Sequence, residues 1–248
     1  MRSARHPLDN AVWLALTGPH AVHADGDDLA RRYDPDVSVF SAIVEDSAEA
    51  WDHLASLTEP GRVAVLFRPP PIPVPDGWTR EFSGDGLQMV LDGELARLPD
   101  PEGDVDGRAV SIRPLGPDDV PAMIELVRIT DPGPFRRRTI DLGGYVGIFH
   151  GEELVAMAGQ RLRPPGYCEV SSVCTHPDAR RRGYAAFVTA HVADQIRARG
   201  EVPFLHLAAS NEAARAVYER LGFRLRRRVA LVVVRPPADD EQTVTPTR

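Results

Sequence analysis

One segment in the second half of this 248-residue chain restricts the fold more than any other. Residues Tyr167–Thr175 have the apolar and β-branched composition of a strand, and His176-Pro177 ends it. The run Arg181–Arg199 then has apolar side chains at helical spacing and stops at Gly200, as helices commonly do. A strand, a tight arginine-rich turn and a helix, in this order, predict an α/β protein.

The rest of the chain contains short elements that suit the same class. Helices and strands are expected at Asp46–Leu57, Arg62–Arg68, Ala109–Arg113, Pro117–Val127, Tyr145–His150, Leu154–Arg163, Val202–Ala209, Asn211–Leu221 and Arg226–Val234. A short arginine-rich helix is expected after the loop at residues 131–134. In the first half, Trp78–Phe82 and Leu87–Leu91 are predicted to form a hairpin around Gly84-Asp85-Gly86.

An acidic segment rich in proline and glycine, Leu98–Gly107, separates two parts of opposite charge. Residues 1–108 carry 9 arginines and 20 acidic residues, a net charge of −11, whereas residues 109–248 carry 20 arginines and 16 acidic residues, a net of +4. The second part is therefore a candidate for binding an anion, although uneven surface charge explains the difference equally well. We predict an α/β domain at 1–97, a linker at 98–107, a second domain at 108–235 and a disordered tail at 236–248.

All 29 basic residues are arginine, so the chain lacks lysine altogether. This excludes the usual P-loop NTPases, protein kinases and Schiff-base enzymes, each of which needs a lysine. Any phosphate must be bound by arginine or by backbone N–H groups. The two cysteines, Cys168 and Cys174, lie roughly 20 Å apart if their segment is a strand, which is too far for a disulfide. They do not form a zinc site either, so we expect no metal.

The apolar runs are short. The longest late run, Val229–Val234, falls well below the roughly 20 residues that span a bilayer, and Ala11–Leu16 is too short for a signal sequence. Together with reduced cysteines, this predicts a cytoplasmic protein that has no membrane partner.

The junction between the strand and the helix has the features of an anion site. Gly183 allows the backbone to turn closely, and the helix that follows starts with unpaired N–H groups. These groups and the helix dipole attract phosphate, and Arg180, Arg181 and Arg182 add positive charge. The same residues also fit an ordinary helix start that contains a glycine and solvated arginines.

Two motifs add a family to this picture. The first is Arg180-x-x-Gly183-x-Ala185 after a strand, and the second is Asn211-Glu-Ala-Ala214-Arg-Ala-Val-Tyr218-Glu-Arg-Leu221-Gly222-Phe223. The first resembles the acetyl-CoA pyrophosphate loop of the GNAT superfamily of N-acetyltransferases, with alanine in place of the more usual glycine at its end. The second is similar to the Asn…Ala…Tyr-x-x-Leu-Gly-Phe motif of that family.

The resemblance covers about Ala109–Arg235 and implies the α/β GNAT fold. That fold is a mixed twisted sheet with splayed central strands, here preceded by a smaller α/β half. This first half resembles the degenerate N-terminal half of two-domain GNAT proteins.

The resemblance also implies where acetyl-CoA, the expected co-substrate, is bound. Backbone groups of Val173 and Thr175 are expected to pair with the pantetheine arm. The loop expected to bind the pyrophosphate consists of Arg180, Arg181, Arg182, Gly183, Tyr184 and Ala185. Asn211 is expected to hydrogen-bond the pantetheine arm, and it also suits the helix N-cap position.

Tyr218 and Glu169 are the implied catalytic residues. Tyr218 lies two helical turns after Asn211, on the same face, and is expected to protonate the departing CoA thiolate. Its alternative role is a core tyrosine. Glu169 is expected to act as the base, directly or through water, with its pKa raised by burial, whereas its alternative role is a surface salt bridge. His206 is the reserve base.

The predicted function is transfer of an acetyl group from acetyl-CoA to a primary amine of a small molecule or peptide, by direct attack. An oxyanion would be stabilised by a backbone N–H near Val173. The alternatives are a non-catalytic acyl-CoA sensor and an enzyme for longer acyl chains. Phe135 and Glu169 are candidate substrate contacts, and Arg136–Arg138 is a candidate contact for an acidic acceptor. Nucleic acid is disfavoured by the net charge, and a homodimer stays open.

Overall fold

The computed structural model describes residues 6–101 and 103–237. Its α-helices are α1 (Ala11–Leu16), α2 (Ala48–Leu57), α3 (Val120–Thr130), α4 (Tyr184–Arg197) and α5 (Glu212–Leu221). Its strands are β1 (Ala24–Gly26), β2 (Ala30–Tyr33), β3 (Phe40–Ile43), β4 (Ala64–Arg68), β5 (Thr79–Val90), β6 (Asp104–Val105), β7 (Arg108–Leu115), β8 (Tyr145–His150), β9 (Glu153–Gln160), β10 (Tyr167–Thr175), β11 (Val202–Ala208) and β12 (Arg224–Arg235). Short 3₁₀-helices lie at Pro7–Asn10, Ala21–His23, Pro117–Asp119, Thr139–Leu142 and Pro177–Ala179.

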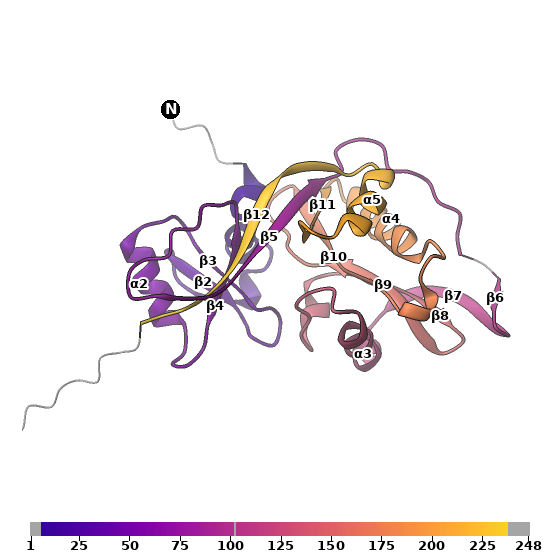
Figure 1. Cartoon of the computed structure of the whole chain (residues 1–248), viewed down its shortest axis with the longest axis horizontal. Coiled ribbons are helices and arrows are strands. Elements are labelled where there is room, and N and C mark those ends of the chain that lie inside the picture. Colours follow the sequence, from indigo (N-terminus) through magenta and orange to yellow (C-terminus); the bar gives the residue numbers. More distant parts are fainter. Residues whose placement is uncertain (1–5, 102, 238–248) are drawn as a thin grey trace, which may run out of the picture.

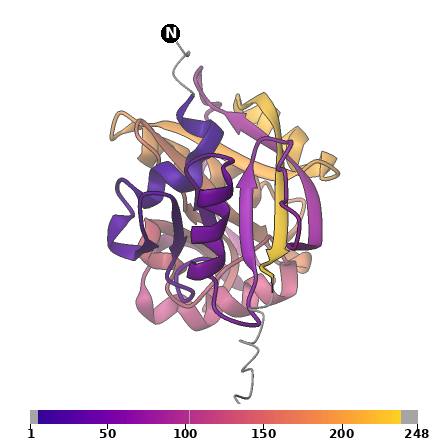
Figure 2. The ribbon, with the colours of Figure 1, turned by 90° about the vertical axis from the view of Figure 1, so that its left-hand side faces the viewer.

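The described strands form one mixed sheet in the order β1-β2-β3-β4-β12-β5-β11-β10-β9-β8-β7-β6. The long antiparallel pair of β5 and β12 lies in the middle and joins the first-half strands to the rest (Figure 1). Figure 2 shows the same join from the first-half end, with β12 in yellow beside the purple strands. The mixed α/β class is thus confirmed, and so are the splayed central strands, because β10 and β11 pair over only three residues each.

Helices cover both faces of the second-half sheet. Helix α4 packs on β8, β9 and β10, and α3 packs on the opposite face of β9 and β10 (Figure 1). In the first half, Trp51 and Leu54 of α2 pack against strand residues such as Ile43 and Leu66. Among the described residues, each helix is too short or too polar to cross a lipid bilayer.

The predicted hairpin in the first half is wrong. Residues Thr79–Val90 form one continuous strand, β5, because β12 pairs along one of its edges and β11 along the other. Gly86 lies within this strand, where an added Cβ would come 2.9 Å from Cγ2 of Val229. The glycine therefore permits close approach of β12, and the sequence pattern was misread as a turn.

The predicted arginine-rich helix after the 131–134 loop is also wrong. The 3₁₀-helix begins only at Thr139, and the backbone N–H of Arg138 donates to Asp36 of the first half. Strands β5 and β12 join both halves of the chain in one sheet. The division into two domains at residues 98–107 therefore stays a prediction. Most of the predicted tail lies outside the described residues.

Candidate active site

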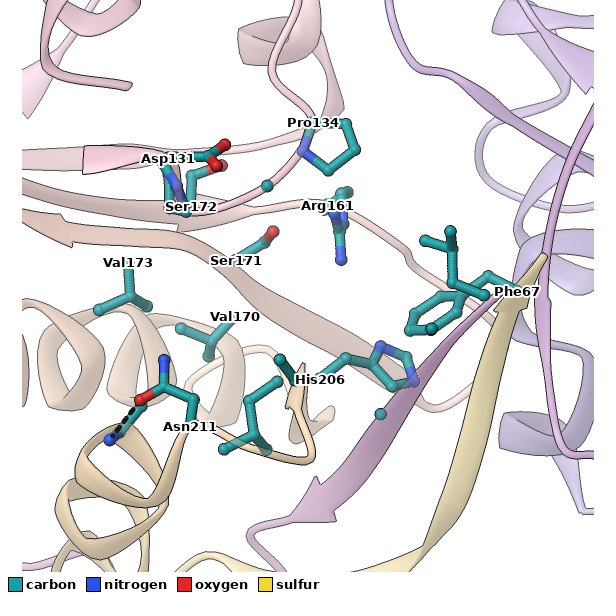
Figure 3. A pocket seen from close by; sticks show the side chains of 18 of the residues that line it. Phe67, Asp131, Pro134, Arg161, Val170, Ser171, Ser172, Val173, His206 and Asn211 are labelled. Atoms are coloured by element: carbon teal, nitrogen blue, oxygen red, sulfur yellow. Dashed lines mark hydrogen bonds between the residues drawn. The ribbon is translucent and has the colours of Figure 1, made fainter. Parts of the chain in front are cut away.

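A cleft opens where two neighbouring strands separate. Strands β10 and β11 pair in parallel only at Tyr167–Glu169 and Val202–Phe204. Beyond these residues β10 pairs with β9 and β11 pairs with β5, which leaves an opening between them. A cavity of about 530 Å³ lies there (Figure 3). Its walls come from β3, β4, β5, β10, β11, β12, α5 and the 131–134 loop.

Val173 lines this cavity at an irregular point of β10. The register between β10 and β9 shifts between Ser171 and Cys174, so that Ser172 and Val173 have no partner on β9. Ser172 has a left-handed backbone, with φ of 54°. This bulge takes backbone groups out of the ladder beside the cavity, where a ligand can reach them.

The start of α4 has the features of an anion site. Gly183 precedes the helix with φ of 81°, Arg181 has φ of 63°, and no side chain caps the helix. The first N–H groups of α4, from Tyr184 and Ala185 onward, therefore have no intrahelical acceptor. Arg180, Arg181 and Arg182 are exposed. Within the described residues, these three arginines make no salt bridge, so their charge is available to an anion.

Two further predicted residues lie on either side of this turn: Thr175 ends β10, and Tyr184 is the first residue of α4. Thr175 Oγ1 is buried, and no hydrogen-bond partner for it exists among the described residues. The hydroxyl of Tyr184 lies 2.9 Å from Nε2 of buried His150, which fixes the first turn of α4 on β8. The predicted loop residues thus follow the end of β10 and lead into α4.

Asn211 begins α5 and lines the same cavity. Its side-chain oxygen accepts a hydrogen bond of 3.0 Å from the backbone N–H of Ala214, so it is the helix N-cap (Figure 3). Its amide NH₂ stays available to a ligand, and the two predicted roles are compatible.

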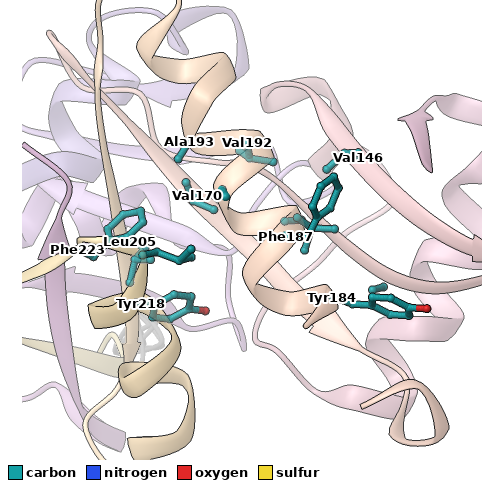
Figure 4. Close-up of a cluster of buried hydrophobic side chains, with 14 of the residues drawn as sticks. Val146, Val170, Tyr184, Phe187, Val192, Ala193, Leu205, Tyr218 and Phe223 are labelled. Carbon is teal, nitrogen blue, oxygen red and sulfur yellow. The ribbon is translucent and has the colours of Figure 1, made fainter. Parts of the chain in front are cut away.

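Tyr218 lies on α5, at the cavity wall and against the core (Figure 4). The side chain is 7% exposed and packs with Phe223 at a ring-centroid distance of 6.1 Å. Burial raises the pKa of Tyr218 to about 12. The phenol is therefore neutral at physiological pH and can donate a proton into the cavity.

Glu169 lies at the point where β10 and β11 separate and is fully buried. Its carboxylate accepts hydrogen bonds from Arg161 Nε at 2.9 Å and Nη2 at 2.7 Å. It also accepts from the backbone N–H of Leu162 at 3.2 Å and lies 2.7 Å from Nδ1 of His206. All four carboxylate lone-pair positions are thereby filled.

The expectation that burial leaves Glu169 with a raised pKa is wrong. Burial alone raises the pKa, but the charge and hydrogen bonds of Arg161, supported by His206, outweigh it and hold the pKa well below its usual range. Glu169 is thus an ionised partner in a buried salt bridge. Its predicted role as a base stays untested, and this arrangement does not favour it.

His206 has both ring nitrogens engaged. Its Nε2 lies 2.9 Å from the side-chain nitrogen of Gln88, which also donates to the carbonyl of Leu8 at 3.0 Å. Arg226 donates to the Gln88 oxygen at 2.7 Å, which fixes the amide orientation. His206 Nε2 must therefore accept, and Nδ1 carries the proton that is donated to Glu169.

The other predicted substrate contacts, Phe135 and Arg136–Arg138, are not among the residues that line the cavity. Phe135 packs on Tyr145 with centroids 5.9 Å apart and joins the α3 core. Arg138 forms salt bridges with Asp34 at 2.7 Å and Asp141 at 3.0 Å, linking the two halves. Arg138 therefore has a structural partner on each side.

Sequence reasoning missed the far wall of the cavity. Arg161, Phe40 and Phe67 line it, and His206 contacts Phe67 with ring centroids 4.4 Å apart. These residues come from distant parts of the chain, and no local pattern marks them. Among the described residues, no cluster of three His, Cys, Asp or Glu side chains is placed to hold a metal ion.

Comparison with known proteins gives the class. The family model described as FR47-like protein matches residues 145–232. A solved GNAT-family structure from Novosphingobium aromaticivorans is 38% identical, covers 94% of this chain and 100% of its own, and superposes with a TM-score of 0.83. A GCN5-related N-acetyltransferase from Kribbella flavida has the same fold at 19% identity, with 92% and 96% coverage and a TM-score of 0.62.

The chain therefore belongs to the GNAT family of acetyltransferases. It is also 42% identical over 53 residues to the [ribosomal protein bS18]-alanine N-acetyltransferase of Salmonella typhimurium. That match spans 21% of this chain and 36% of that enzyme.

Proposed function

We propose that this protein transfers an acetyl group from acetyl-CoA to a primary amine of a small molecule or peptide, by direct attack of the amine on the thioester. The observation that carries the proposal is the position of Tyr218, a buried neutral phenol on the wall of a cleft between splayed strands. A proton donor at this place can protonate a leaving group that lies between β10 and α5.

The cofactor would lie along β10 and over the start of α4. Backbone groups of Val173 and Thr175 and the amide of Asn211 would hold the pantetheine arm. The N–H groups from Arg181 to Ala185, together with the arginine triplet that begins at Arg180, would take the pyrophosphate. In support, the helix start is uncapped by any side chain and the three arginines are exposed.

The chemical step follows from this placement. The amine nitrogen attacks the thioester carbonyl, and the oxygen that becomes negative meets a backbone N–H near Val173, where the bulge opens the ladder. The carbon–sulfur bond then breaks, and Tyr218 gives its proton to the sulfur. Burial makes this phenol a weaker acid than it is in water, so proton transfer accompanies bond cleavage rather than preceding it.

The acceptor amine must first lose a proton. We propose that water in the cleft mouth takes this proton, because the carboxylate of Glu169 is filled by four hydrogen bonds. Glu169 then acts as a positioning residue that fixes Arg161 and His206. After the attack the nitrogen is positively charged, and it gives a second proton to the same water as the amide forms. A proton then returns from solvent to the Tyr218 phenolate after the product leaves.

An amine acceptor is in keeping with the partial relative, which acts on an alanine of a ribosomal protein. We also propose action in the cytoplasm, where the two buried thiols, Cys168 and Cys174, stay reduced. No metal takes part in the proposed step.

The test is release of free CoA thiol from acetyl-CoA with a panel of primary amines, for wild type and Tyr218→Phe. We expect turnover in wild type and a loss of about 10²- to 10⁴-fold in kcat for the variant, with KM for acetyl-CoA unchanged within about threefold. Binding of CoA without turnover of any amine would favour a sensor, and turnover only with longer acyl-CoA would favour another acyl donor.

A further inference from the structure

The inner wall of the cavity presents the donor groups of a buried cation, Arg161. A guanidinium has five N–H groups, and the bonds to Glu169 use two of those on Arg161. Arg161 nevertheless lines the cavity, and Figure 3 shows it extending into the space that Ser171, Phe67 and His206 surround. Among the described residues Nη1 makes no hydrogen bond, so it is available to an occupant of the cavity.

Glu169 and His206, which lie beside Arg161, cannot accept a hydrogen bond from a ligand. The carboxylate of Glu169 is filled by its four hydrogen bonds. The Nε2 of His206 already accepts from Gln88. The cation of Arg161 therefore favours a ligand group that supplies oxygen lone pairs, since neither Glu169 nor His206 can accept a hydrogen bond from that group.

The remainder of the inner wall is apolar. Phe40, Phe67 and Leu231 form it, and the guanidinium of Arg161 lies 5.1 Å from the centroid of the Phe40 ring. These residues come from β3, β4 and β12, so strands of the first half together with β12 close the cavity behind Arg161. A polypeptide chain that continued past its first carbonyl would meet this wall.

The part of the cavity beside Ser172 is acidic. Exposed Asp131 lies there in Figure 3, and exposed Asp85 of β5 also lines the cavity. The carboxylate of Asp131 attracts an ammonium group to this part, next in the chain to Val173, where the thioester would lie. The cavity thus has a cation-attracting end and an anion-accepting end.

From this polarity we infer that the acceptor is a free amino acid with an apolar side chain. Its carboxylate would bind Arg161, its side chain would pack on Phe40 and Phe67, and its amine would face Val173. The inference rests on the proposed function, since it names the acceptor of the same site. The cavity volume of about 530 Å³ is within the range of small-molecule sites.

The first test compares three amines on wild-type protein by thiol release with acetyl-CoA. Phenylalanine keeps the carboxylate, phenylalaninamide keeps only a neutral carbonyl, and phenethylamine has neither. We expect kcat/KM, corrected for the fraction of free amine, to be about 10- to 100-fold higher for phenylalanine, because a charged hydrogen bond is made only there. Equal or better turnover of phenylalaninamide or phenethylamine would overturn the inference while leaving acetyl transfer intact.

The second test uses the double variant Arg161→Gln with Glu169→Gln, which removes both charges and leaves no buried ion unpaired. We expect the ratio of kcat/KM for phenylalanine to that for phenethylamine, measured within this variant, to fall to within about threefold. Arg163→Gln is the matched control, because Arg163 is half-exposed and pairs with Glu201 at 2.6 Å. A preserved preference in the folded double variant would overturn the inference.

Leucine and isoamylamine repeat the comparison with an aliphatic side chain. If no amine with or without a carboxylate releases thiol, acetyl transfer itself is wrong and the acceptor assignment falls with it. The two failures are therefore distinguishable.

Discussion

The two ends of the cleft are built in different ways. The end proposed for the cofactor (the cofactor end) comes from one stretch of chain, from Val173 to Tyr218, and includes exposed arginines and an uncapped helix start. The end proposed for the acceptor (the acceptor end) gathers side chains as far apart as Phe40 and Leu231, and its Glu169 and Arg161 are buried and paired. A local segment thus forms the first end, while sheet topology forms the second.

The difference extends to electrostatics. Exposed arginines at the cofactor end keep their hydration and can exchange it for phosphate oxygens. At the acceptor end, Glu169 is 0% exposed and Arg161 is 11% exposed as a side chain, so each depends on the other for its charge. Substitutions at the cofactor end should therefore weaken ligand binding, whereas substitutions of Arg161 or Glu169 should lower the free energy of unfolding.

The largest effect is expected from Arg161→Ala. This change leaves the buried Glu169 carboxylate without its main partner, which costs about 3–5 kcal/mol of the free energy of unfolding. For a chain of this size, that corresponds to a fall of roughly 6–20 °C in Tm. Thermal and denaturant unfolding, followed by circular dichroism, measure it.

The charge-free double variant of Arg161 and Glu169 to glutamine is the control, and it should recover most of the lost stability. The salt bridge also makes stability depend on pH. The native pKa of Glu169 is lowered, so its contribution is complete above the unfolded value near 4.5 and is lost as the pH falls below it. A change of less than 1 kcal/mol in Arg161→Ala would contradict the view that this end depends on pairing.

The same contrast explains what the sequence could predict. Strand Tyr167–Thr175 has the predicted bounds, and the helix after it begins at Tyr184, three residues later than expected. These elements show their periodicity locally. Arg161 meets Glu169 only through the register of β9 and β10, and Phe40 and Phe67 reach the cavity only through the sheet order. A single sequence contains no signal for either.

Glycines were a second source of error for the same reason. The sequence alone does not distinguish the roles of Gly183 and Gly86. Gly183 has φ of 81° before a helix, whereas Gly86 makes room for Val229 within a strand. The local pattern decides the first case correctly. The second is decided by a strand that lies more than a hundred residues away in the chain.

A smaller effect is expected at the cofactor end, from Gly183→Val. An added Cβ meets nothing within 4 Å, so the cost is the left-handed backbone alone, about 1–2 kcal/mol for an ordinary residue. If the helix start shifts to relieve it, its N–H groups move, and KM for acetyl-CoA should rise roughly 10-fold. Steady-state kinetics and the thermal shift with CoA measure this.

Gly183→Asn is the matched control, because asparagine tolerates the left-handed region. It should stay within about threefold of wild type in KM. Equal behaviour of the valine and asparagine variants would mean that the helix start does not depend on this conformation, and the anion site would lose its main support.

The smallest expected effect concerns Tyr218, where the two ends of the cleft meet. We expect kcat not to change with pH in the range where an exposed tyrosine would ionise. Burial in apolar surroundings raises the pKa of Tyr218 to about 12, in contrast to the lowered pKa of Glu169. The phenol donates a proton only below its pKa, so kcat should not fall between about pH 8 and 10, where an exposed tyrosine would begin to ionise. Nor should kcat fall between about pH 7 and 5 through protonation of Glu169, whose pKa lies lower still. The measurement is kcat at saturating amine across this range, with folding checked at each pH. A decline centred near pH 10 would mean that Tyr218 is hydrated in the working enzyme, and the contrast between its neutral phenol and the buried charges of Glu169 and Arg161 would then fail.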